Sequence, residues 1–180
     1  MKKDSQEELF EKYPKLFRQK DLDMSQTCMC WGINTGEGWW RLLDKICSWV
    51  NFHTIENKHL YPQIEFTQVK EKFGTLSLYF NTISKDEKIS IWKRIKKAYE
   101  CLRYGYSRND NMRDYFSGKL AGAIEFAESL SDEICEQCGK EGKLQSINEW
   151  WVTLCDQCKK ERNKEEVQQE ANNIIEAKDK

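Results

Sequence analysis

Two cysteine pairs near the C-terminus constrain the fold of this 180-residue chain more than any other feature. The pairs are Cys135 with Cys138 and Cys155 with Cys158, and sixteen residues separate them. The short spacing lets two sulfurs point at one ion, and the longer segment can form a hairpin that joins the pairs. Four thiolates suit tetrahedral zinc. The spacing therefore predicts a zinc ribbon that binds structural Zn²⁺ and leaves no open position for a substrate.

The composition indicates a small, aromatic-rich core, and the helices and strands predicted along the chain indicate an α+β fold. Hydrophobic residues make up 39% of the chain and charged residues 33%. Seven Trp, eight Phe and seven Tyr offset the low apolar share, because each aromatic side chain buries a large area. No apolar run has the length of a membrane helix, and none follows the N-terminal lysines as in a signal peptide. We therefore expect a cytoplasmic protein with no membrane contact.

The other cysteines are interpreted mainly as buried thiols, because a reducing cytoplasm disfavours a disulfide scaffold. A second metal site that combines Cys28, Cys30 and Cys47 is an alternative, although C-x-C chelates less well than C-x-x-C. Cys47 with His53 is an alternative nucleophilic pair, but no recognisable motif surrounds it. We therefore predict that the chain is not an enzyme.

Residues 1–83 are predicted to form a module of helices and a β-hairpin. Ser5 and Glu8 match a capping box, and Pro14 should end the helix that follows. The loop 28–39 carries glycines that we interpret as turn residues before a second helix over 39–51. The apolar face of that helix comprises Trp40, Leu43, Ile46, Cys47 and Val50.

The hairpin is predicted over 63–81, with its turn at 72–75. Its first strand is expected to alternate strictly between two faces. Ile64, Phe66 and Gln68 share one face, opposite Glu65, Thr67 and Val69. On the second strand Leu76, Leu78 and Phe80 share one face. A two-stranded hairpin is marginal alone, so we expect it to pack on the 39–51 helix.

Residues 84–131 are predicted to insert two helices, over 84–106 and 111–130. Gly118 and Gly122 lie four apart in the second and would allow another backbone to approach closely, at a helix-propensity cost of about 1 kcal/mol each. The apolar stripe of that helix comprises Met112, Phe116, Leu120, Ala123, Ala127 and Leu130.

The insertion carries the most basic part of the chain. Residues 85–119 contain ten basic and five acidic side chains, net +5, although the whole chain has a net charge of −1. Basic side chains neutralise phosphates, and aromatic side chains can stack on unpaired bases. The alternative is an ordinary amphipathic helix with solvated lysines. The candidate nucleic-acid contacts are Lys93, Arg94, Lys96, Lys97, Arg103, Tyr104, Arg108 and Arg113.

Residues 132–180 are predicted to form the zinc ribbon and a C-terminal helix. The ribbon strands are expected at 144–146 and 150–154. Trp150 and Trp151 are adjacent in the second strand and should point to opposite faces, with one of them in the core.

Three segments resemble a family of uncharacterised phage and prophage zinc-ribbon proteins. They are the loop WGINTGEGW at 31–39, the strand QVKEKFG at 68–74, and the C-x-x-C-G and L-C-x-x-C pairs at 135–139 and 154–158. The family places its ribbon soon after the hairpin, whereas this chain inserts 84–131. The resemblance implies a phage setting, a bacterial host cell and a zinc ribbon, and no reaction.

The expected function is that of a non-enzymatic accessory protein that binds a host protein or ribonucleoprotein. An inhibitor of bacterial antiviral defence, specifically an anti-CRISPR protein that engages guide RNA or an RNA-guided nuclease, fits this setting best. The alternatives are a nucleic-acid-binding zinc-ribbon regulator, a metal-dependent nuclease and a virion component. The nuclease would need an open metal site from scattered residues, namely Glu37, Asp44, His53, His59 and Glu65.

Overall fold

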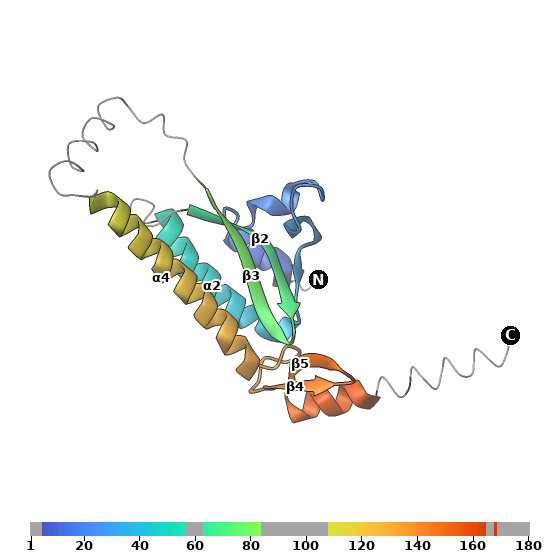
Figure 1. The fold of residues 1–180 in the computed structure, drawn as a ribbon. Coiled ribbons are helices and arrows are strands. Elements are labelled where there is room, and N and C mark those ends of the chain that lie inside the picture. The colour runs from blue at the N-terminus through green and yellow to red at the C-terminus, as the bar shows by residue number, and fades with distance from the viewer. Residues whose placement is uncertain (1–4, 57–62, 84–107, 165–167, 169–180) are drawn as a thin grey trace.

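The computed structural model describes residues 5–56, 63–83, 108–164 and 168. It confirms a mixed α+β fold with a three-stranded sheet, helices that both precede and follow its hairpin, and a C-terminal two-stranded ribbon (Figure 1). The expected helix over 84–106 lies outside the described residues. None of the described helices combines the length and the apolarity needed to cross a bilayer.

The larger sheet has the strand order β1-β2-β3. Its strands are β1 (Ile33–Asn34), β2 (Gln63–Lys72) and β3 (Thr75–Ile83). β1 runs parallel to β2 and pairs Ile33 with Val69, whereas β2 and β3 form the predicted antiparallel hairpin. The prediction that 28–39 is only a loop was incomplete. The side-chain oxygen of Gln6 accepts a hydrogen bond from the Ile33 amide at 2.6 Å. This contact between residues far apart in sequence helps to hold β1 in place.

Strict alternation along β2 was wrong beyond Phe66. Phe66 pairs with Phe80 but Gln68 pairs with Tyr79, so Thr67 is an extra, bulged residue. One extra residue exchanges the two faces of a strand. As a result Val69, and not Gln68, is buried. The Thr27 hydroxyl donates to the carbonyl of Thr67 at 3.1 Å, which satisfies the bulged peptide.

The hairpin turn lies where the sequence predicted it. Phe73 and Gly74 both have positive φ, 53° and 77°. Two consecutive residues of positive φ define a type I′ turn, whose twist matches that of paired strands.

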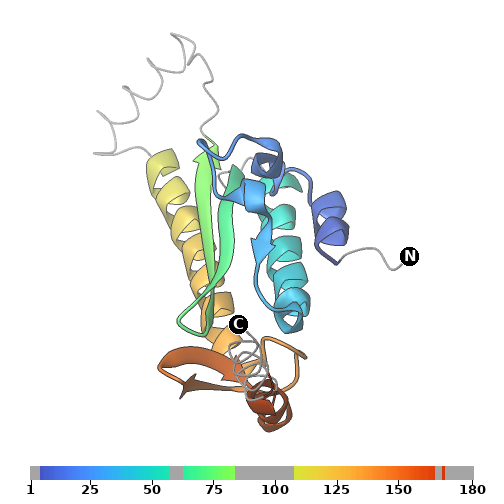
Figure 2. The ribbon, with the colours of Figure 1, turned by 90° about the vertical axis from the view of Figure 1, so that its right-hand side faces the viewer.

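Helices α2 (Trp40–Asn51) and α4 (Arg108–Leu130) lie side by side on one face of this sheet (Figures 1 and 2). The short helix α1 (Ser5–Lys12) ends before Pro14 as predicted. Three further short helical turns lie between α1 and α2, and a π-helical turn follows α2. These are η1 (Arg18–Asp21), η2 (Met29–Trp31), η3 (Glu37–Trp39) and the π-turn η4 (Phe52–Glu56).

The apolar face of α2 was predicted correctly except at its first residue. Leu43, Ile46, Cys47 and Val50 are buried. Trp40 is only partly buried, and the preceding residue Trp39, at the end of η3, lies in the core instead.

Two predictions about α4 need correction. No described segment makes a close approach at Gly118 or Gly122, since within the described part of the chain a Cβ on either would have no neighbour within 4 Å. Ile124 was missed from the stripe, and it is buried with Leu120 and Ala127.

The C-terminal unit begins with η5 (Ser131–Glu133), at the end of α4. Its strands β4 (Lys143–Ile147) and β5 (Trp150–Leu154) pair antiparallel, and residues 156–164 are helical. Both strands were predicted. Neither Trp150 nor Trp151 is in the core, contrary to expectation, because both precede the part of β5 that covers the cysteines. The small ribbon core comprises Cys135, Ile147, Val152, Leu154 and Cys158.

Candidate metal centre

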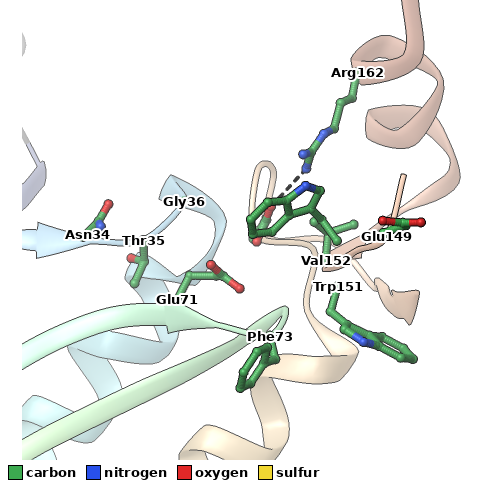
Figure 3. Close-up of a pocket in the computed structure, with 11 residues that line it drawn as sticks. Asn34, Thr35, Gly36, Glu71, Phe73, Glu149, Trp151, Val152 and Arg162 are labelled. Atoms are coloured by element: carbon green, nitrogen blue, oxygen red, sulfur yellow. Dashed lines mark ion pairs between the residues drawn. The ribbon is translucent and has the colours of Figure 1, made fainter. Parts of the chain in front are cut away.

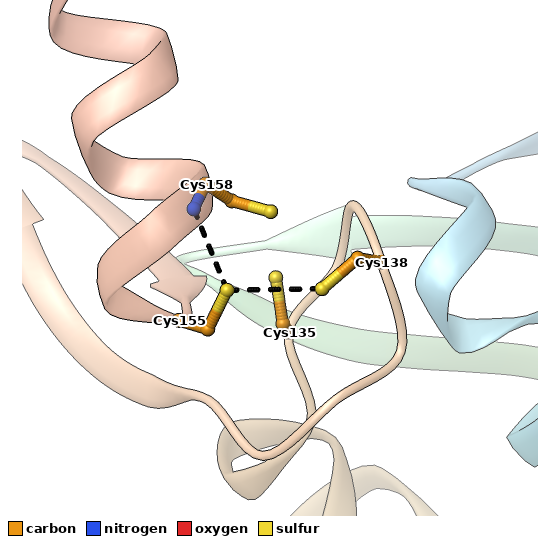
Figure 4. A group of neighbouring side chains, drawn as sticks. All are labelled: Cys135, Cys138, Cys155 and Cys158. Carbon is orange, nitrogen blue, oxygen red and sulfur yellow. Dashed lines mark hydrogen bonds between the residues drawn. The ribbon is translucent and has the colours of Figure 1, made fainter.

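The four ribbon cysteines gather at one point, as the spacing predicted (Figure 4). Cys135 and Cys138 lie on the loop before β4, and Cys155 and Cys158 lie at the start of the 156–164 helix. All four sulfurs lie within 4.8 Å of one another, and those of Cys138 and Cys155 are 3.7 Å apart. Among the described residues, this is the His, Cys, Asp and Glu group that could hold a metal ion.

Backbone hydrogen bonds fold the first pair into a tight turn. The amide of Gly139 donates to the Cys135 carbonyl at 2.9 Å, and the amide of Cys135 donates to the Lys140 carbonyl at 2.8 Å. Gly139 has φ of 72°, a conformation that costs glycine little. The glycine after the first pair therefore sets the geometry of the ligands.

The thiols of the second pair differ in acidity. The Cys158 amide donates to the Cys155 sulfur at 3.4 Å and lowers the pKa of Cys155 to about 7. Burial and the hydrogen bond to Cys155 raise the pKa of Cys158. A metal cation favours the thiolate form of every ligand, so its binding would release protons.

The glycine-rich loop packs directly against the first cysteine pair. The Gly38 amide donates to the Glu136 carbonyl at 2.7 Å. A Cβ on Gly36 would lie 2.1 Å from the Glu136 carbonyl oxygen, and one on Gly38 would lie 2.1 Å from that of Cys135. Because only glycine fits at either position, these residues do more than form turns before α2.

Two further contacts hold the ribbon to the rest of the fold. The indole nitrogen of Trp39 donates to the Ile134 carbonyl at 2.7 Å. The Thr153 hydroxyl donates to the Gly74 carbonyl at 2.6 Å, from β5 to the hairpin turn. The three sequence segments at 31–39, 68–74 and 135–158 therefore meet at one place, around the candidate metal centre.

Sequence reasoning missed this convergence. The available signal was the pair of glycines on either side of Glu37, because glycine is used where another backbone approaches closely. No sequence pattern predicted the hydrogen bond from Thr153 to Gly74, because the two residues are far apart in the sequence.

The candidate nucleic-acid contacts are only partly covered by the structure. Arg108 and Arg113 lie in the first turns of α4. The other six candidates lie outside the described residues. These are Lys93, Arg94, Lys96, Lys97, Arg103 and Tyr104.

The remaining thiols do not form a second ligand group within the described ranges. Cys28 is exposed, and the Cys30 thiol donates to the Thr27 carbonyl at 3.1 Å. Cys47 is fully buried in the core, and burial raises its pKa. His53 packs against Trp49, with ring centroids 4.2 Å apart.

Two carboxylates of the nuclease alternative have structural partners. Asp44 accepts hydrogen bonds from Lys12 at 2.6 Å and from the Tyr13 hydroxyl at 2.9 Å. Glu65 is buried and pairs with Arg18. His59 lies outside the described residues.

No protein-family model matches the chain, and neither a curated protein nor a solved structure shows significant similarity to it. Fold and site together define an α+β protein whose C-terminal unit brings together four cysteines that could hold a metal ion.

Proposed function

We propose that Cys135, Cys138, Cys155 and Cys158 hold one structural zinc ion. Tetrahedral zinc with sulfurs at about 2.3 Å requires neighbouring sulfurs about 3.8 Å apart. The separation between Cys138 and Cys155 is 3.7 Å. The ion would supply folding free energy, because the ribbon core is small.

Metal analysis of the purified protein tests this assignment. We expect one zinc per chain, lost in the double variant Cys135→Ser, Cys138→Ser and retained in the control Cys28→Ser, Cys30→Ser. Retention of one zinc by the first variant would show that the ion is held elsewhere.

We further propose that the protein is a non-enzymatic, phage-type accessory protein that binds a host macromolecule in the bacterial cytoplasm. The observation that carries this proposal is the place of the cysteine group. It lies where the loop of Gly36 and Gly38 meets the ribbon, and so it supports the fold at a junction of three segments. A four-thiolate site of this kind is closed, and a closed site stabilises structure without activating a substrate.

Within this class, we favour an anti-CRISPR inhibitor that engages guide RNA or an RNA-guided nuclease. Its support is the resemblance of the 31–39, 68–74 and 135–158 segments to phage proteins, together with the net charge of +5 over 85–119. A basic segment with interleaved aromatic residues suits RNA, and the acidic C-terminal part suits a basic protein surface.

Charge reversal tests the nucleic-acid part of the proposal. We expect salt-dependent binding of guide RNA that is lost in Lys96→Glu, Lys97→Glu, Arg103→Glu. The matched control reverses three exposed lysines elsewhere, Lys15, Lys45 and Lys143. Equal loss in both variants, or no binding at low salt, would contradict the contact.

A cleavage assay tests the inhibitory role. Addition of the protein should reduce target cleavage by the affected RNA-guided nuclease at a fixed guide concentration. RNA binding without inhibition would favour the regulator instead, and metal-dependent cleavage by the protein itself would favour the nuclease.

A further inference from the structure

A groove of about 520 Å³ separates the hairpin turn and β1 from the ribbon (Figure 3). The β1 end contributes Asn34 and Thr35, the hairpin contributes Glu71 and Phe73, and the ribbon contributes Trp150 and Trp151. Its volume lies within the range of about 300–1,000 Å³ that is common for ligand sites.

The walls of the groove are aromatic and solvent-exposed. Phe73 is 70% exposed, Trp150 73% and Trp151 50%. Large aromatic side chains that gather in an exposed groove, outside the core, mark a binding surface, and Trp is the residue type most enriched among binding hot spots. None of the three belongs to either core cluster.

Carboxylates line the same groove. Three carboxylates, Glu71, Glu136 and Glu149, and one cation, Arg162, are among the lining residues and give the lining a net charge of −2. The side chain of Glu136 is only 15% exposed, and its oxygen lies 4.0 Å from Arg162 Nη1, beyond hydrogen-bonding distance. A second cation placed between these carboxylates would therefore be stabilised.

We propose that this groove binds an arginine-containing segment of a protein partner. A guanidinium can stack on an indole face and pair with a carboxylate at the same time, and lysine does both less well. The negative lining disfavours nucleic acid, because a phosphate backbone would be repelled. The inference deepens the proposed function by giving the chemistry of the partner. It rests on that function only in taking the partner to be a host macromolecule.

Fluorescence polarisation with the purified full chain tests the proposal. The probes are short labelled peptides of glycine alternating with arginine, lysine or uncharged citrulline, and a labelled single-stranded RNA. The arginine peptide should bind most tightly and the citrulline peptide not at all. Trp150→Ala should weaken arginine-peptide binding about tenfold or more, and Glu149→Gln should weaken it less.

The controls are Trp31→Ala and Glu125→Gln, which change exposed residues outside the groove. Both should bind the arginine peptide like the unmodified protein, and zinc content should be equal in all variants. The proposal is overturned if arginine and citrulline peptides bind alike, or if Trp150→Ala has no effect. It is equally overturned if Trp150 is needed for RNA binding or for self-association. This assay needs no defence system, so its failure is distinct from failure of the inhibition assay.

Discussion

The glycines of this chain differ in whether another segment packs against them. Gly38 lies against the backbone of the first cysteine pair, whereas Gly118 on α4 meets none of the residues that the structure describes. The same substitution at the two positions should therefore change stability in opposite directions.

Gly38→Ala should destabilise the protein, because the new Cβ would lie 2.1 Å from the Cys135 carbonyl oxygen. Overpacking of this kind costs about 1–3 kcal/mol. Urea denaturation of the zinc-loaded protein measures the change, and a midpoint equal to that of the unmodified protein would contradict the backbone contact.

Gly118→Ala should stabilise the protein by about 0.5–1 kcal/mol, since alanine has the higher helix propensity and its Cβ would meet no atom of the described segments. The same denaturation experiment serves as the measurement. A loss of stability would show that another segment approaches this face of α4.

Cysteine reactivity should follow exposure. Burial raises the pKa of Cys47, so its thiolate population is small near neutral pH, whereas Cys28 is exposed. Brief alkylation of the zinc-loaded protein should label Cys28 and leave Cys47 unlabelled by mass spectrometry. Both should react in denaturant, and rapid labelling of native Cys47 would contradict its burial.

At the scale of elements, the features that could be predicted are those set by local patterns. The hairpin turn at 72–75, most of the apolar face of α2, and the ribbon strands all follow from residues close in sequence. The bulge at Thr67 could not be predicted, because Thr27 supplies the partner of its carbonyl. The strand at Ile33 depends in the same way on Gln6.

The candidate site shows the same division. The C-x-x-C spacing identifies all four cysteines of the candidate site, since the two members of each pair are close in sequence. Gly38 packs on Cys135, but the hairpin and α4 separate the two residues in the sequence. No local sequence pattern therefore predicts this contact. Trp150 and Trp151 were misplaced because strand alternation does not show how far a small core extends.

The junction between hairpin and ribbon gives a prediction for these elements. Thr153→Val removes the donor to the buried Gly74 carbonyl and should cost about 1–3 kcal/mol. The control Thr75→Val removes a hydroxyl that bonds the Lys72 carbonyl at an exposed turn and should cost less than about 0.5 kcal/mol. Equal effects in urea denaturation would show that the junction adds no stability.

At the scale of the whole molecule, the candidate metal centre is joined to the body of the fold by hydrogen bonds. The Gly38 amide donates to the carbonyl of Glu136, which lies between Cys135 and Cys138, and the Trp39 indole donates to the carbonyl of Ile134, which precedes Cys135. Loss of the ion should therefore loosen residues far from the ribbon in sequence.

Removal of zinc by a chelator should increase amide hydrogen exchange at 36–39 and 72–75 as well as in the ribbon. The C-terminal half of α2, whose residues pack in the main core, is the internal control and should change little. Exchange that increases only within 134–164 would show that the two parts are independent.

The contact of Gly38 with Cys135 also bears on how such proteins diverge. A side chain at position 38 is excluded only if the turn of Cys135 and Cys138 packs against that position. In return, the Glu136 carbonyl of this turn accepts the Gly38 amide only if the glycine loop is present. Relatives of this chain should therefore keep both features or lose both together. Substitutions at 36 and 38 should then be confined to lineages that have lost the ribbon cysteines.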